Sequence, residues 1–134
     1  MTLEDLRKFF AAEFPQSTVV LEALDAGTVR VRQPVDARHL RPGGTVSGPV
    51  LMSTADSAMY AALLAEIGPV ALAVTTSLHI DFLRKPPADR DIVAEARLLK
   101  LGKRLAVGEI TLYSAGVADP VARASLTYSI PPRR

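Results

Sequence analysis

The longest apolar stretch of the chain runs from Val50 to Ala65 and contains neither glycine nor proline. Alanine, leucine and methionine dominate this stretch, and all three are strong helix formers. Pro49 stands where the first helical turn tolerates proline, and Gly68-Pro69 supplies a stop signal. The pattern predicts a helix of about 18 residues, about 27 Å long. Because it is apolar nearly all the way round, we expect it to be buried.

The segment before this helix predicts a short helix and a hairpin. Thr2 is a candidate N-cap with an acidic residue three positions later, and Pro15 ends the amphipathic segment that follows. The β-branched runs Thr18–Leu24 and Thr28–Gln33 flank a turn and predict a β-hairpin. Residues 34–44 hold two prolines and two glycines, and we expect them to form a loop.

After Gly68-Pro69 the period of the pattern changes to two. Between Val74 and Leu83, apolar side chains alternate with the polar residues Thr75, Ser77, His79 and Asp81, which is typical of a half-buried strand. Further strands are expected at 91–100, at 104–114 and in the segment that ends at Ile130. Three or four of these strands should form a meander. The fold class is therefore α+β, with one antiparallel sheet of five or six strands against the long helix.

Composition narrows the function classes. With 134 residues the chain makes one domain, 1–134, and it has no cysteine, so disulfides and thiolate chemistry are excluded. Two histidines make a zinc site unexpected, and we expect no metal and no cofactor. A net charge of +2 and few aromatic residues give no support for nucleic-acid binding. Polar residues interrupt the apolar helix, so we expect no membrane association and a soluble, cytoplasmic protein.

The apolar helix also bears on assembly. One small sheet can cover only part of a helix that is apolar all round. A second copy of the chain is the natural cover for the remainder, so we expect a homodimer.

Asp56 is the one charged residue of this helix before Glu66. A carboxylate in an apolar environment has to be paired, protonated or used in chemistry. Two interpretations stay open at this point. Asp56 is either a catalytic acid or a structural carboxylate, paired with Arg38 or Arg41 or capping a neighbouring backbone group.

The segment around the helix start resembles the hotdog fold, in which a curved sheet wraps a long central helix. It is similar in particular to the phenylacetate-degradation type of acyl-CoA thioesterase, which carries Gly-Thr-x-His-Gly-Gly and an acid nine residues after the histidine. Here the motif stands as Gly44-Thr45-Val46-Ser47-Gly48-Pro49, and Asp56 lies nine residues after Ser47. The strand before Arg84-Lys85-Pro86 resembles the third strand of the family, and the resemblance covers residues 18–130.

The resemblance implies hydrolysis of a small or medium acyl-CoA to the free acid and CoA. The backbone N–H of Gly48, at a helix N-terminus, would stabilise the developing oxyanion. Asp56 would act as nucleophile or general base. In the family these two groups come from different subunits, and dimers commonly pair into a homotetramer. Thr75 matches a serine or threonine that positions water, and we expect it on the polar strand face, toward the partner subunit.

Three positions depart from the family motif. Ser47 replaces the histidine, Pro49 replaces the second glycine, and Arg41 stands where some members have asparagine seven residues before the motif glycine. We keep Ser47 among the catalytic candidates, although as an isolated serine it is better read as an N-cap. Arg41 and Pro49 are candidates for substrate binding.

Coenzyme A carries phosphates, so basic loop residues become candidates for binding it. These are Arg84, Lys85, Lys103 and Arg104, whose other interpretation is ordinary solvation of strand edges. Two other functions stay open. A hotdog dehydratase or hydratase would use a loop histidine such as His39, and a non-catalytic acyl-CoA-binding protein would need neither acid nor base. The acyl group cannot be read from the sequence.

Overall fold

The computed structural model describes residues 1–132. It contains the helices α1 (Leu3–Glu13) and α2 (Gly48–Ile67) and a short 3-10 turn, η1 (Ala37–His39). The strands are β1 (Val20–Asp25), β2 (Thr28–Gln33), β3 (Leu40–Arg41), β4 (Thr45–Val46), β5 (Val74–Phe82), β6 (Ile92–Leu101), β7 (Leu105–Ser114) and β8 (Ala122–Ser129). The predicted α+β architecture is confirmed, with a six-stranded antiparallel sheet and one long helix against it.

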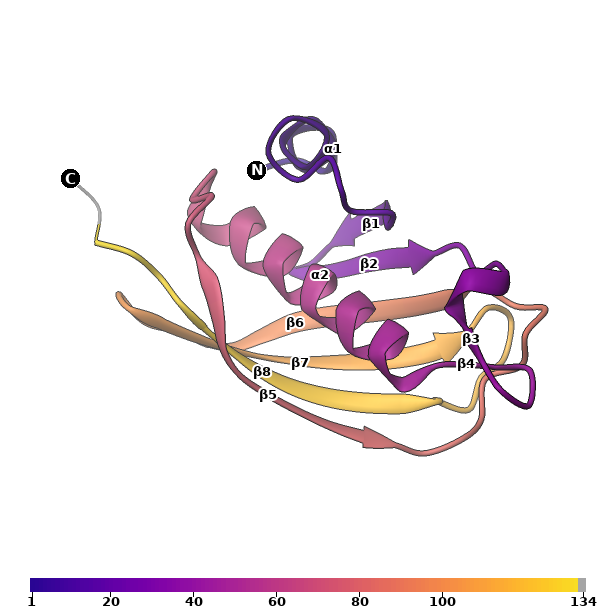
Figure 1. Cartoon of the computed structure of the whole chain (residues 1–134). Helices are drawn as coiled ribbons and strands as arrows, with labels where there is room; N and C mark the ends of the chain where they lie inside the picture. The colour runs from indigo at the N-terminus through magenta and orange to yellow at the C-terminus, as the bar shows by residue number, and fades with distance from the viewer. Residues whose placement is uncertain (133–134) are drawn as a thin grey trace.

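The sheet order is β1-β2-β6-β7-β8-β5 (Figure 1). The expected meander is confirmed for three strands and does not include β5. Strands β6, β7 and β8 are consecutive neighbours, but β5 lies beyond β8 at the far edge. The chain passes from α2 to that edge and then returns to place β6 beside β2. Local periodicity predicts that β5 is a strand, but it contains no information on which strand β5 will pair with.

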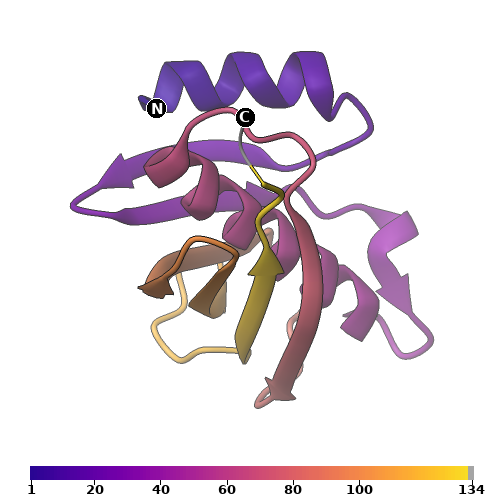
Figure 2. The same cartoon turned by 90° about the vertical axis from the view of Figure 1, so that its left-hand side faces the viewer.

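The curved sheet wraps around one side of α2 (Figures 1 and 2). Helix α2 packs chiefly against β6, β2 and β7, and less against β5 and β8. As the sequence predicts, the single sheet therefore covers only part of this apolar helix. Pro49, Met52 and Ser53 are exposed and Asp56 is half-buried, and these positions share one helix face. Helix α2 is long and apolar enough to cross a bilayer. However, 61% of its apolar segment is buried inside the fold, so it is the core helix.

Both helices begin and end close to where the pattern predicts. Thr2 and Asp5 form the reciprocal capping box of α1. Helix α2 spans 20 residues and ends at Ile67, and it is followed by the cap residue Gly68, whose φ of 86° is a conformation that favours glycine. Ser47 occupies the N-cap position of α2 but makes no side-chain cap hydrogen bond, so its expected capping role is not realised.

The loop predicted at 34–44 is more ordered than expected. It contains η1 and pairs β3 with β4 in a second, two-stranded sheet. The backbone N–H of Ser47 donates to the His39 carbonyl at 2.9 Å, and that of Val46 donates to the Pro86 carbonyl at 3.1 Å. These two hydrogen bonds fix the chain immediately before Gly48, and so set the position at which α2 begins.

The close approach of α2 to the sheet depends on Gly108 in β7. A Cβ atom at this position would overlap the sulfur of Met59, which is fully buried, and would lie 3.2 Å from the carbonyl oxygen of Arg97. We expect Gly108→Val to lower the free energy of unfolding by about 1–3 kcal/mol, the usual cost of overpacking a core. Urea unfolding measures the change. Thr111→Val, on the outer face of the same strand, is the control, and equal effects of the two substitutions would contradict this packing.

Candidate active site

Asp56 lies in the middle of α2, on the side that faces the ends of β5 and β8. Its Oδ1 atom accepts a hydrogen bond from the Thr75 hydroxyl at 2.5 Å and another from the Tyr128 hydroxyl at 2.8 Å. The Tyr128 hydroxyl also lies 3.2 Å from the backbone carbonyl oxygen of Asp56. Among the described residues Oδ2 has no hydrogen-bond donor. The carboxylate is therefore held through one oxygen and has the other free.

Thr75 reaches Asp56 because β5 contains a β-bulge. The register against β8 shifts between Thr75 and Ser77, so that Thr75 pairs with Tyr128 while Ser77 pairs with Thr127. Thr75 and Tyr128 are thus on the face toward α2, and Ser77 is on the opposite face. The expectation that Thr75 shares the polar face with Ser77 is wrong, because one inserted residue reverses the alternation and re-aims the side chain.

Tyr128 is a site residue that the sequence analysis did not single out. It alternates with polar residues along β8, and nothing in its local sequence distinguishes it from the buried residues beside it. Burial, followed by the nearby Asp56 carboxylate, raises the pKa of Tyr128 well above its usual value. The phenol therefore stays protonated and serves as a hydrogen-bond donor.

Asp56 opens into a cavity of about 410 Å³ between α2, the end of α1 and the start of β5. Phe14, Tyr60 and Tyr128 contribute aromatic walls, and Tyr60 stacks on Tyr128 with ring centroids 6.0 Å apart. The Tyr60 hydroxyl donates to the carbonyl oxygen of Ala71 at 2.9 Å. The carboxylate thus stands beside an aromatic recess with space for a small organic group.

Gly48 lines a different cavity of about 450 Å³, at the start of α2. Its backbone N–H has no acceptor among the described residues, as expected in the first turn of a helix. The ring of Phe82 lies 3.2 Å from where a Cβ atom would stand, so glycine keeps this backbone accessible. Arg41, Arg84 and Lys85 line the same cavity, which places three cationic side chains around a free backbone donor.

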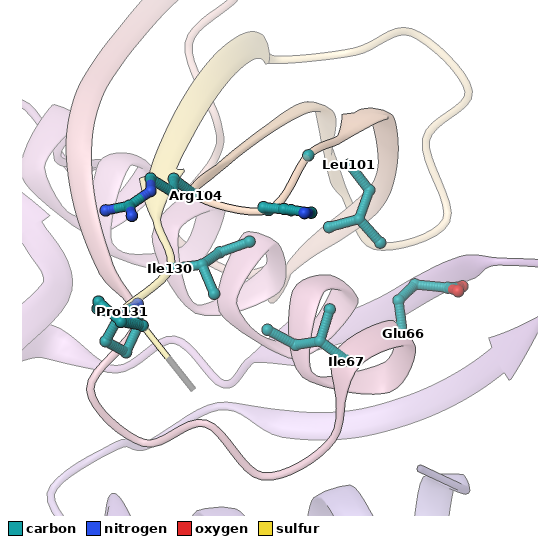
Figure 3. A pocket seen from close by; sticks show the side chains of 9 residues that line it. Glu66, Ile67, Leu101, Arg104, Ile130 and Pro131 are labelled. Carbon is teal, nitrogen blue, oxygen red and sulfur yellow. The ribbon is translucent and has the colours of Figure 1, made fainter. Parts of the chain in front are cut away.

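Lys103 and Arg104 line a third cavity, of about 580 Å³, whose lining does not include Gly48. Figure 3 shows this cavity, with Arg104, Ile130 and Ile67 around it. Its walls come from the end of α2, from the turn between β6 and β7, and from residues 130–132. The backbone N–H of Ile130 donates to the Arg104 carbonyl at 2.7 Å, which attaches the turn to the end of β8. The four basic residues expected to meet phosphates therefore divide into two separate groups.

The structure does not pair Asp56 with an arginine. Arg38 pairs with Asp36 at 2.8 Å, and Arg41 has no ion pair among the described residues. His39 accepts a hydrogen bond from the backbone N–H of Asp36 at 2.9 Å, and neither it nor His79 lines the cavity that holds Asp56. No group of three metal-binding side chains occurs in residues 1–132. The site around Asp56 therefore consists of one carboxylate and two neutral hydroxyl donors, Thr75 and Tyr128.

Gly48 and Asp56 of one chain are too far apart to act on the same carbonyl group. Eight residues of α-helix separate them by about 12 Å along the axis. An oxyanion donor and an attacking group each have to come within about 3 Å of one reacting carbonyl. The two groups therefore belong to different sites within a single chain, in line with their different cavities.

Comparison with known proteins identifies the family. The model of the thioesterase superfamily matches residues 43–120, which include Gly48, Asp56 and Thr75. A candidate thioesterase from Silicibacter is 49% identical, with a TM-score of 0.90 over 98% of this chain and 93% of that one. A mutant of the phenylacetic acid degradation protein PaaI from Thermus thermophilus is 29% identical, with a TM-score of 0.74 over 92% of this chain and 99% of that one. A candidate esterase from Saccharolobus solfataricus is 31% identical over 128 residues, which are 95% of this chain and 78% of the relative. The chain therefore has the hotdog fold and belongs to the thioesterase superfamily.

Proposed function

We propose that this thioester hydrolase acts on acyl-CoA and releases the free acid and coenzyme A. The observation that carries the proposal is the Asp56 carboxylate, which is held through Oδ1, has no hydrogen-bond donor to Oδ2 among the described residues, and lines an aromatic cavity. Family membership supplies the reaction class, and the cationic residues around the cavities are suited to an anionic carrier.

In the proposed reaction Asp56 attacks the thioester carbonyl carbon or takes a proton from the water that attacks it. The carbonyl oxygen becomes an oxyanion that the backbone N–H of Gly48 stabilises, reinforced by the dipole of α2. The C–S bond then breaks and coenzyme A leaves as a thiolate that takes up a proton. If Asp56 is the nucleophile, water hydrolyses the acyl-aspartyl anhydride and regenerates the carboxylate.

We propose a homodimer in which each site is shared. The separation of Gly48 from Asp56 along one helix means that a complete site needs Gly48 from one subunit and Asp56 from the other. Two antiparallel copies of α2 around a two-fold axis would bring these groups together twice. The exposed face of α2 at Pro49, Met52 and Ser53 is the surface that such a partner would cover.

The edge of β5 supports the same assembly. This nine-residue strand bonds to β8 on one side only, and a long free edge invites pairing with another chain. Val74, its first residue, is 56% exposed, and Phe82, its last residue, is 53% exposed. We propose that the β5 edges of two subunits meet, and that dimers pair further into tetramers as in the family that the chain resembles.

The remaining residues receive proposed roles from their positions. Ser47 precedes the oxyanion donor and has a hydroxyl that is not used in capping, so it can donate to the thioester carbonyl in place of the family histidine. Pro49 leaves the first turn of α2 without one N–H and keeps Gly48 as the donor. Arg41, with Arg84 and Lys85, would bind the anionic substrate near Gly48.

The two alternative functions differ in what they require. A dehydratase or hydratase needs a histidine beside the acid, and neither histidine lines the Asp56 cavity. A non-catalytic binding protein has no use for a carboxylate oriented by two hydroxyl groups. Release of free thiol from a panel of short, aryl and medium-chain acyl-CoA substrates tests the proposal. Turnover of at least one substrate supports the proposal. Binding of acyl-CoA without turnover points to the binding protein, and loss or gain of water by the acyl group points to a dehydratase or hydratase.

We expect Lys103 and Arg104 to bind the phosphates of coenzyme A. The variant Lys103→Gln/Arg104→Gln should raise KM for acyl-CoA and leave kcat unchanged, because uniform binding is lost. The increase should shrink at high salt, since exposed ion pairs are screened over about 8–10 Å near physiological ionic strength. A pantetheine thioester without the nucleotide is the control substrate. Equal loss on both substrates would mean that these residues only stabilise the β6–β7 turn.

We propose a cytoplasmic location, because coenzyme A thioesters are intracellular metabolites. The burial of α2 against the sheet fits a protein that does not use this helix as an anchor.

A further inference from the structure

Tyr128 is the second donor to the carboxylate oxygen that Thr75 holds. The two hydroxyl groups approach Oδ1 of Asp56 from two adjacent strands, at 2.5 Å and 2.8 Å. Two charge-assisted hydrogen bonds to one oxygen fix both the side-chain torsion and the plane of the carboxylate. The free oxygen therefore has one defined direction.

The surroundings of Tyr128 are suited to holding a group in place. Its side chain is buried, with 3% of its surface exposed, and its ring stacks on Tyr60. Thr75 is exposed at the edge of the sheet and depends on the bulge for its direction. Of the two donors, Tyr128 is thus the one whose position is set by the packed core.

We infer that Tyr128 is a positioning residue that orients Asp56, so that Oδ2 is the oxygen that attacks the thioester or takes the proton from water. This inference rests on the proposed function. It also assigns Thr75 to the carboxylate: its hydroxyl is already donated to Asp56, so it orients the acid and does not position the water.

The two hydroxyl groups act after the first step as well. If Oδ2 bonds to the acyl carbon and the thiolate leaves, Oδ1 becomes the carbonyl oxygen of the anhydride. The hydrogen bonds from Thr75 and Tyr128 then polarise that carbonyl group. If Oδ2 instead accepts the proton of water, the same donors keep the carboxyl group in place until the proton is released.

The test compares Tyr128→Phe with the wild type on an acyl-CoA substrate that the wild type hydrolyses. We expect kcat to fall about ten- to a hundredfold, the rate equivalent of one hydrogen bond to a charged group, and KM to stay within about twofold. Thr75→Val should have an effect of the same kind, and Thr75→Ser should restore most of the rate because it keeps the hydroxyl. In the double variant Thr75→Val/Tyr128→Phe, the fold loss in kcat should be smaller than the product of the two single-variant losses, because both donors act on one oxygen.

Tyr113→Phe is the matched control. Tyr113 is on the outer face of β7 and lines neither the Asp56 cavity nor the Gly48 cavity, so the same chemical change should leave kcat and KM unaltered. Thermal unfolding and sedimentation of each variant separate a local effect from loss of fold. A folded Tyr128→Phe with the kcat of the control overturns the inference. A wild type that hydrolyses no acyl-CoA overturns the proposed function itself, and this inference with it.

A crystal structure of Asp56→Asn with an acyl-CoA bound keeps the test valid even if Tyr128→Phe does not fold. Thr75 and Tyr128 should still contact the amide atom at the Oδ1 position, and the thioester carbon should lie next to the atom at the Oδ2 position. A thioester carbon that approaches the atom held by Tyr128 overturns the assignment of Oδ2.

Discussion

Asp56→Asn is expected to remove thioester hydrolysis, with kcat reduced by about a thousandfold or more, as for other enzymes that lose a general base. An amide can neither attack the thioester carbonyl nor accept the proton of water. The substitution preserves shape, and the amide oxygen can still accept the hydrogen bonds from Thr75 and Tyr128. The fold and the oligomer should therefore persist, and substrate binding should be retained. Single-turnover thiol release, together with sedimentation and thermal unfolding, measures all of these properties.

Asp81→Asn provides the matched control. Asp81 belongs to β5 but lies on the outer face of the sheet, where it pairs with His79 and Arg123 at 3.2 Å. Neutralising this carboxylate should leave turnover at the wild-type level. Equal activity of the two variants would refute the assignment of Asp56, and loss of the folded oligomer in Asp56→Asn would make its carboxylate structural.

Two inactive variants are expected to regain activity when their subunits are mixed. Gly48→Val places a branched side chain where the thioester carbonyl has to approach the backbone, and its Cβ is already within 3.2 Å of the Phe82 ring. Asp56→Asn removes the acid. In a heterodimer of the two, one of the two shared sites has both Gly48 and Asp56 intact. A random mixture should thus recover about a quarter of the wild-type activity, because half of the dimers are mixed and each has one good site of two.

The control mixes wild-type subunits with subunits that carry both substitutions. Each site of that heterodimer lacks one component, so the mixture should be no more active than its wild-type homodimers alone. Differently tagged subunits, refolded together, show how many heterodimers have formed. If heterodimers form and the first mixture stays inactive, the site lies within one subunit and the shared arrangement is wrong.

Much of the site could be predicted from the sequence because Gly48 and Asp56 both lie on the central helix. The spacing of Gly48 and Asp56 is visible along one element, and α2 itself follows from composition and stop signals. The start of α2, the capping box of α1 and the strands 91–100 and 104–114 were predicted close to their observed bounds. These features depend on residues that are close in the sequence, so a local sequence pattern is enough to predict them.

What the sequence alone determined is therefore the two helices, the six strands of the main sheet and the one carboxylate among apolar residues. The tertiary structure decided the rest. It placed β5 at the sheet edge beyond β8, and it inserted the bulge that turns Thr75 toward Asp56. It also brought Tyr128 to a carboxylate 72 residues away in the chain. The physical reason is that register and strand partners are set by packing across the whole sheet, where a shift of one residue moves every following side chain to the other face.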